Sequence, residues 1–419
     1  MALVAHSHRA SDGNNLVVRG TVRTFLLATL GAVAAGTVIG ALLLWPDGGK
    51  LDAIRKETPF AAPGVTTASG HVMDVAPACP ISQGQSESHP RCGTIDVKIV
   101  DGAGKGNSVQ VQVAPEVTAS GLGPGDQVQL LRTPAQHGQP VSYTFDTIDR
   151  NAPLLWLTVC FVLVVVAVAR LRGLMALVGL VTSGLTIYYF LLPALLAGEP
   201  AILVTTVTAS AIMFVVLYTT HGPNLRTSTA LAGTLVGIAL TAGISALSIG
   251  YTHLTGVADE TGGMVATFAA GLDFQGLLAA GVILAGLGVL NDVTITQASS
   301  VWELRAASPE MSRRQLFMRA MRIGQDHIAS TIYTIAFAYA GASLAVLMLL
   351  SIYDRPLLQL ISGEPLAEEI ARTIVTSIGL ILAVPITTAI ATVVTSVAHE
   401  SDRRSVVAPA HAHEDRTSA

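Results

Sequence analysis

Carboxylate and hydroxyl side chains recur at helical spacing in the stretch 281–341, inside a chain that is otherwise strongly apolar. A run of small apolar residues turns polar at Asn291 without acquiring the composition of a loop. If the helix continues, its 100° per residue places two carboxylates and two hydroxyls on a stripe about 60° wide. Such oxygen atoms could bind a cation or relay a proton. The four residues are Asp292, Thr296, Ser299 and Glu303.

A second polar stripe is predicted on the hydrophobic helix that follows. His327, Thr331, Thr334 and Gly341 align within roughly 100°. Asp326 adds a carboxylate beside His327, whose imidazole titrates near neutral pH. Because polar groups are costly in a bilayer, two facing polar stripes indicate a binding site for an ion or a small solute, with proton coupling as one form of this hypothesis.

Each of these groups also has a structural interpretation. Asp292 and Glu303 could lie wetted at the cytoplasmic end of the helix and pair with Arg305 or Arg322. For Asp292, which lies deeper in the apolar run, we favour a functional role, whereas for Glu303 both interpretations stay open. Asn224 belongs to a secondary polar cluster that could meet the site from a neighbouring loop.

The composition places the chain in a membrane. Of its 419 residues, 51% are hydrophobic and 12% are charged, which is too apolar for an ordinary soluble protein. The net charge of -4 carries little meaning, because the placement of Lys and Arg decides topology. We expect an α-helical polytopic protein with about eight transmembrane helices. They are predicted at 24–45, 153–169, 173–196, 201–219, 229–250, 273–290, 328–352 and 372–397.

The first apolar run separates two polar regions. Residues 1–23 are predicted to form a cytoplasmic tail, and 24–45 a retained transmembrane anchor. A cleaved signal peptide is the alternative, although its apolar region would be shorter and a cleavage site would follow. Residues 399–419 are polar and predict a disordered cytoplasmic tail.

Residues 46–150 predict a small extracytoplasmic β-rich domain, for which a barrel is one arrangement. Apolar and polar residues alternate in TIDVKIV, SVQVQV, QVQLLR and VSYTFDTI, between turns rich in Gly and Pro. Cys79 and Cys92 are disulfide candidates in an exported domain, with two free thiols as the alternative. His71 and His89 lack the spacing of metal ligands, so a metal site is not predicted here. No cofactor is predicted.

Residues 151–398 predict a membrane domain of seven helices with both termini of the chain in the cytoplasm. The arginines of the tails and short loops gather on one side of this arrangement, and only Arg355 and Arg372 fall on the other. A basic amphipathic helix near 309–325 begins with a capping-box pattern from Ser312 to Gln315. It is expected to lie on the membrane surface, or to act as a lever that joins the two polar stripes.

Glycines recur in two of the spans, at Gly233, Gly237 and Gly243 and at Gly276, Gly281 and Gly288. Helices in lipid associate by close packing, so these small residues predict contact faces more than a pore lining. Asp273, at the outer end of one span, is expected to cap its helix.

The chain also carries a resemblance. The segments GLGVLNDVTITQASSVWEL, the Gly-Gln-Asp-His opening of the next helix, FAYAG, SYTFDTIDR and GPNLRTSTALAGTL resemble the YibE/F family of bacterial multi-spanning membrane proteins. The resemblance extends over most of residues 90–395. It implies membrane helices with a soluble domain in the cell (inner or plasma) membrane, and it names no substrate.

Two classes of function follow. A permease or transporter for an ion or small solute fits the intramembrane carboxylates. A scaffold, which anchors the external β-domain for a cell-envelope partner or a second copy of the chain, needs fewer helices. An enzyme is not predicted, because no catalytic motif lies in its required context. Nucleic acid is not an expected partner, since the basic residues follow the membrane side and lack interleaved aromatics.

Overall fold

The computed structural model describes residues 20–57, 64–77, 92–135, 140–268, 271–352 and 356–395. The chain divides into two compact units, one of residues 55–168 and the other of residues 1–54 and 169–419. Both predicted tails lie largely or wholly outside the described residues, as does Cys79.

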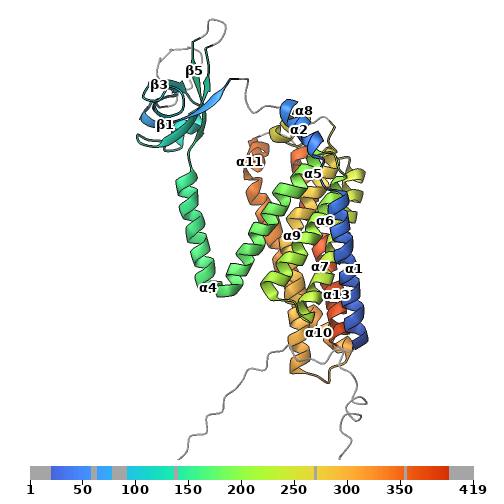
Figure 1. Cartoon of the computed structure of the whole chain (residues 1–419). Coiled ribbons are helices and arrows are strands. Elements are labelled where there is room, and N and C mark those ends of the chain that lie inside the picture. The colour runs from blue at the N-terminus through green and yellow to red at the C-terminus, as the bar shows by residue number, and fades with distance from the viewer. Residues whose placement is uncertain are drawn as a thin grey trace, which may run out of the picture. The chain divides into compact units, whose positions relative to one another are not determined.

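The smaller unit contains a five-stranded antiparallel sheet in the order β3-β2-β1-β4-β5. The short helix α3 (Pro115–Ala119) lies between β3 and β4 in the chain. The edge strands β3 and β5 approach each other, so the sheet curls into a half-barrel (Figure 1). The strands are β1 (Thr66–Val75), β2 (Thr94–Asp101), β3 (Ser108–Gln112), β4 (Gln127–Thr133) and β5 (Ser142–Ile148).

The core of this unit follows the alternation of the strands. Ile95, Val97 and Ile99 of β2 are buried, and Val72 of β1 pairs with Val97. The four alternating segments are confirmed as β2 to β5, whereas β1 was not predicted. Its sequence TTASGHVMDV alternates weakly and holds Gly70, whose missing side chain admits Val97 at close range.

The two described cysteines differ. Cys92 is disulfide-bonded, and because Cys79 lies outside the described residues, the pairing of the two stays a prediction. Cys160 is a free, exposed thiol.

The larger unit is a bundle of helices. In Figure 1, α6, α7, α9, α10 and α13 run side by side, and α1 lies along α6 and α7. The helices of the chain, besides α3, are α1 (Gly20–Leu43), α2 (Gly48–Glu57), α4 (Asn151–Thr186), the π-helix η1 (Ile187–Leu191), α5 (Leu192–Leu196), α6 (Ala201–His221), α7 (Leu225–Thr252), α8 (Glu260–Phe268), α9 (Phe274–Ala307), α10 (Arg313–Ala342), α11 (Leu344–Ile352), α12 (Leu357–Ile361) and α13 (Glu364–Val394).

Six helices in the described part of the chain are long and apolar enough to cross a membrane, or seven if the bent pair α10 and α11 is one span. The predicted number of about eight differs because the spans 153–169 and 173–196 fall on one helical stretch, Asn151–Leu196. Arg170 interrupts this stretch with φ 53° and ψ -134°, at the position where the sequence predicts a turn. At about 1.5 Å per residue, the stretch is more than twice as long as a bilayer core of about 30 Å.

Helix α10 corrects one prediction. Its N-terminus has the predicted capping box, in which Ser312 and Gln315 bond each other's backbone. The helix then runs without a break to Ala342, so the expected amphipathic helix near 309–325 is the first part of a longer helix. Leu316 and Ala320 are fully buried in the bundle, and this packing explains why the segment does not form a separate surface helix.

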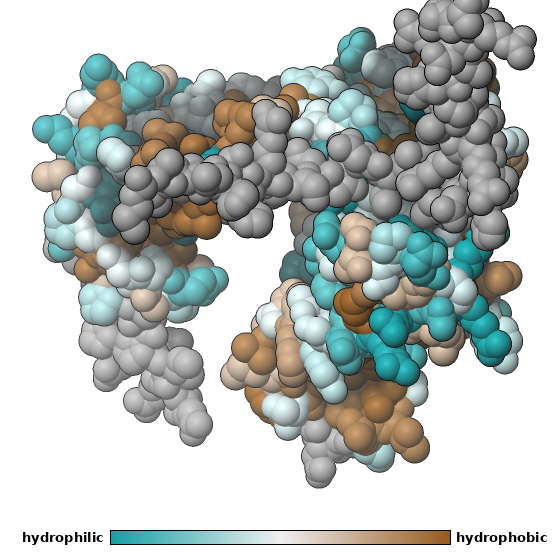
Figure 2. Space-filling view, turned by 90° about the horizontal axis from the view of Figure 1, so that it is seen from below, coloured by the Kyte–Doolittle hydropathy of each residue, from teal (hydrophilic) through white to brown (hydrophobic). Residues whose placement is uncertain are grey.

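The outer surface of the bundle suits a bilayer. Large apolar side chains such as Phe25, Leu247 and Phe337 are exposed on it. Figure 2 shows hydrophilic residues gathered at the end of the bundle, and α10 begins at that end with exposed arginines at 313, 314 and 319. Apolar flanks with polar ends are typical of helices that cross a membrane.

Candidate functional site

The predicted polar stripes meet at one pair. Helix α9 continues through Asn291 as predicted, and α10 packs antiparallel against it. His327 Nε2 lies 3.6 Å from Asp292 Oδ2. This distance suits an ion pair with a protonated imidazole and is too long for a hydrogen bond. The Asp292 side chain is 69% exposed, so the pair lies at an open edge of the α9–α10 interface.

The other residues of the two stripes lie at different depths. Thr296 and Ser299 are half-buried on α9, and Glu303 is exposed and forms no ion pair within the described residues. Asp326 is exposed on α10. The hydroxyl of Thr331 donates to the His327 carbonyl at 2.7 Å, so it is engaged within its own helix. Asn291 Oδ1 is buried and has no hydrogen-bond partner in the described part of the chain.

Two predicted polar residues have structural roles. Asn224 caps α7: its Oδ1 accepts a bond from the Thr227 amide, and its Nδ2 donates to the carbonyls of His221 and Gly222. Asp273 caps α9 through the Gly276 amide, which confirms the cap expected there. Asn224 is therefore the N-cap residue of α7, and the structure does not bring it to the Asp292–His327 pair.

Arg305 holds the turn between α9 and α10. Its side chain is buried, and Nη1 donates to the carbonyls of Pro309 and Met311 at 3.0 and 2.7 Å. Arg305 thus stabilises the loop, and it does not neutralise Asp292 or Glu303 as the structural interpretation of the sequence proposed.

Gln297 is a polar connection at the centre of three helices, and sequence analysis did not single it out. It is 2% exposed, and its Nε2 donates to the Ala320 carbonyl of α10 at 3.0 Å and to Thr388 Oγ1 of α13 at 2.7 Å. Gly324 leaves the space beside its amide. A buried amide with partners on two other helices links α9, α10 and α13 at one point.

A stripe of polar and small residues runs along most of α13. Its members fall within about 100° around the helix axis and span roughly 28 Å along it, close to the thickness of a bilayer core. We call this stripe, together with the residues of α7 and α9 that pack on it, the polar seam. Its members on α13 are Glu368, Arg372, Thr376, Gly379, Ala383 and Thr387.

Helices α7 and α13 approach each other in the polar seam through glycines placed opposite threonines. A Cβ built on Gly379 would collide with the Thr241 hydroxyl, and a Cβ on Gly233 would collide with the Thr387 hydroxyl. In the first contact the glycine belongs to α13 and the threonine to α7, whereas in the second the glycine belongs to α7 and the threonine to α13. The prediction that glycines mark contact faces is confirmed for Gly233, whereas Gly243 has open space.

Some hydroxyl groups of the seam form hydrogen bonds to another helix, and others have no hydrogen-bond partner among the described residues. Thr234 and Thr294 hydrogen-bond each other across α7 and α9 at 2.6 Å. The hydroxyls of Ser245 and Thr387 are buried and have no hydrogen-bond partner among the residues that the structure describes. Buried polar atoms without a partner are uncommon in proteins and call for an explanation.

Sequence analysis missed the acidic end of the seam because it began the last span at residue 372. Helix α13 begins at Glu364, two turns earlier, and Glu368 is buried in it. Glu368 and Glu369 precede that predicted span and were not singled out. Only the packing of the α7–α8 loop over this end reveals the burial.

Six long apolar helices in the described part of the chain, with large apolar side chains exposed on the outside of the bundle, are compatible with a membrane protein. The family model of YibE/F-like proteins matches residues 157–397, and the chain belongs to this family. No curated protein and no solved structure matches the chain. No group of three or more metal-ligating side chains is found among the described residues.

Proposed function

We propose that the chain is a transporter of a small ion or solute in the cell (inner or plasma) membrane, coupled to protons through groups inside its helix bundle. The polar seam is the observation that supports this proposal most. A bundle that only anchors a domain needs small residues for packing, but it gains nothing from buried hydroxyls without partners. A seam about as long as the bilayer core provides polar positions across it.

The Asp292–His327 pair is the proposed proton-responsive group on the cytoplasmic side. Gln297 connects the seam to α10, and His327 lies two turns further along that helix than Ala320, which Gln297 contacts. A proton on His327 creates an attraction to Asp292 that a neutral imidazole lacks. The pair can therefore change the contact between α9 and α10 when the protonation state changes.

Both termini are proposed to be cytoplasmic, with the β-domain on the other side of the membrane. The arrangement of arginines along the sequence supports this topology. Reporter fusions at the C-terminus and accessibility of a cysteine introduced at Lys105, in the loop between β2 and β3, test it from opposite sides.

Transport is tested by comparing cells that carry the wild-type chain or Asp292→Asn, with ions and small metabolites measured inside and outside. Glu303→Gln is the matched control, because Glu303 is an exposed carboxylate on the same stripe of α9. We expect a gradient of one solute class that depends on Asp292 and is unchanged in the control, while both variants keep wild-type thermal stability.

The opposite result favours a scaffold. If no solute differs between the strains and the separately exported β-domain restores a deletion phenotype, transport is rejected. The helices then serve to present that domain to an envelope partner.

A further inference from the structure

Glu368 is a buried carboxyl group at the end of the polar seam away from Gln297. The residue is 7% exposed, and its Oε1 has no hydrogen-bond partner within the described residues. A carboxylate in such a position loses its hydration without an equivalent replacement. The uncharged acid does not carry this penalty.

The charges around Glu368 are unevenly balanced. The groups that act on it electrostatically are Glu364, Glu369 and Arg372 from its own helix and Asp259 from the loop before α8. Four carboxyl groups therefore share one arginine. Glu364 is itself engaged, because its Oε1 accepts bonds from the amide and the hydroxyl of Thr255.

Arg372 stands between two acids. In this structure its Nε lies 3.8 Å from Glu369 Oε2, and the two residues are three apart on α13. Glu368 is four residues before Arg372, which is also a spacing that brings side chains together on a helix. Arg372 pairs with Glu369, and Glu368 forms no ion pair within 4.0 Å among the described residues, so its charged form is only weakly compensated.

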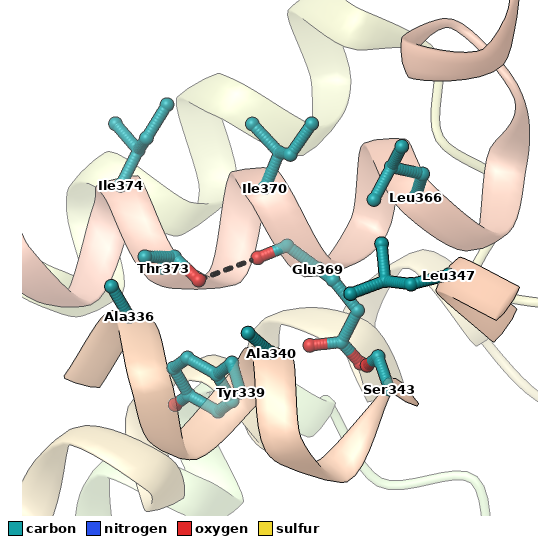
Figure 3. A pocket seen from close by; sticks show the side chains of 10 residues that line it. All are labelled: Ala336, Tyr339, Ala340, Ser343, Leu347, Leu366, Glu369, Ile370, Thr373 and Ile374. Carbon is teal, nitrogen blue, oxygen red and sulfur yellow. Dashed lines mark hydrogen bonds between the residues drawn. The ribbon is translucent and has the colours of Figure 1, made fainter. Parts of the chain in front are cut away.

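Glu369 is the more accessible of the two acids. It lines a pocket of about 200 Å³ between α13 and the end of α10, where Tyr339 and Ser343 also lie. Figure 3 shows its carboxylate between the two helices, close to Ser343. The pocket is otherwise lined mainly by apolar side chains. A half-buried acid that lines this pocket, next to a buried one, gives a proton a route between the surroundings and the seam.

We propose that Glu368 is the proton-binding residue at this end of the seam and that Arg372 exchanges between the two acids. With a proton on Glu368, Arg372 pairs with Glu369, as observed here. Loss of that proton leaves a carboxylate that attracts Arg372 away from Glu369 and opens the contact beside the pocket. The site takes a proton and not a metal ion, because it offers no set of convergent ligands within the described residues. This inference rests on the proposed transport function.

The test labels the purified full chain with a hydrophobic carbodiimide, which adds to protonated carboxyl groups in apolar surroundings, and locates the label by peptide mass spectrometry. We expect labelling at Glu368 at low pH. The labelling should fall with rising pH, by about tenfold per unit once most of the group is deprotonated. Glu364→Gln and Glu369→Gln keep the reactive residue, so Glu368 should still be labelled at low pH in both variants.

Three outcomes overturn the proposal. Absence of label at Glu368 at every pH, or equal labelling of Glu364, shows that the buried acid is not the protonated one. Protection by sodium or potassium chloride, but not by choline chloride, at constant pH assigns a cation site instead. Arg372→Lys tests the exchange of this side chain between Glu368 and Glu369. A lysine that reaches only one of the two acids should change the pH at which half of the labelling at Glu368 is lost.

Labelling does not require transport, so the two proposals can fail separately. Labelling of Glu368 without any Asp292-dependent solute gradient rejects transport and keeps the proton site. A gradient that Glu368→Gln leaves with unchanged pH dependence, in a variant of wild-type thermal stability, rejects the proton site and keeps transport.

Discussion

The contact between Gly379 and Thr241 can be tested by adding a single methyl group. In Gly379→Ala the new Cβ would collide with the Thr241 hydroxyl and lie 3.2 Å from the Thr241 Cβ. The atom that would be hit is the hydroxyl oxygen of Thr241, which is attached directly to Cβ. This threonine is buried, and its hydroxyl donates a hydrogen bond to the Gly237 carbonyl of its own helix. Relief therefore requires α7 and α13 to separate or Thr241 to leave its rotamer.

The cost follows from two opposed terms. Overpacking a close-packed interior costs about 1–3 kcal/mol, whereas Ala in place of Gly favours a helix by about 1 kcal/mol. Gly243→Ala carries only the second term, because no atom lies within 4 Å of a Cβ built there. The difference between the two variants should therefore be about 1–3 kcal/mol, with Gly379→Ala the less stable.

The assay is the midpoint of thermal unfolding of the full chain, purified in one detergent. A loss of 1 kcal/mol corresponds to about 2–4 °C for a domain of 150–250 residues, so a difference of several degrees is expected. Thr241→Ala removes the colliding hydroxyl, and the double variant should recover part of the loss. Equal midpoints for Gly379→Ala and Gly243→Ala, or no recovery in the double variant, would refute the packing of α7 on α13 described here.

Three further predictions concern polar contacts of α9 and α10. Gln297→Leu removes two interhelical hydrogen bonds, and the loss should be about 1–2 kcal/mol in the same melting assay. Arg305→Ala leaves two loop carbonyls without their donor. It should destabilise the protein by at least about 2 kcal/mol and speed protease cleavage within residues 308–312. Ser312→Ala breaks the capping box, costs about 0.5–2 kcal/mol and raises amide hydrogen exchange in the first turn of α10.

The first two of these variants each have a matched control. Ser300→Ala removes a hydroxyl that bonds only its own helix, at the Thr296 carbonyl, and should leave the midpoint nearly unchanged. Arg314→Ala removes an exposed arginine next to the same loop. If a control lowers the unfolding midpoint as much as the variant it is matched to, the loss of stability does not come from the specific hydrogen bonds.

Local chemistry explains which features the sequence predicts. The capping box at Ser312, the cap at Asp273 and the continuation of α9 through Asn291 depend on residues within a few positions of one another. The strands β2 to β5 follow from strict alternation. The encounter of Asp292 with His327 was expected because two consecutive helices with facing stripes pack antiparallel.

Features that depend on distant segments were not predictable in the same way. Nothing in the spacing of Gln297 distinguishes it from an exposed glutamine, because its partners come from α10 and α13. The burial of Glu368 depends on packing against other parts of the fold. Asn224 was grouped with the site on residue type, whereas its position after Gly222 determines that it caps α7.

The two reciprocal glycine–threonine contacts hold α7 and α13 together as one rigid unit. Thr387 of α13 fits beside Gly233 of α7, and Thr241 of α7 fits beside Gly379 of α13. Sliding either helix along the other, in either direction, drives a threonine into a neighbouring side chain at both contacts. Alternating exposure of the seam would therefore have to come from α1 or α10 moving against this pair. A disulfide that joins α7 to α13 should leave transport intact, whereas one that joins α10 to α13 should stop it.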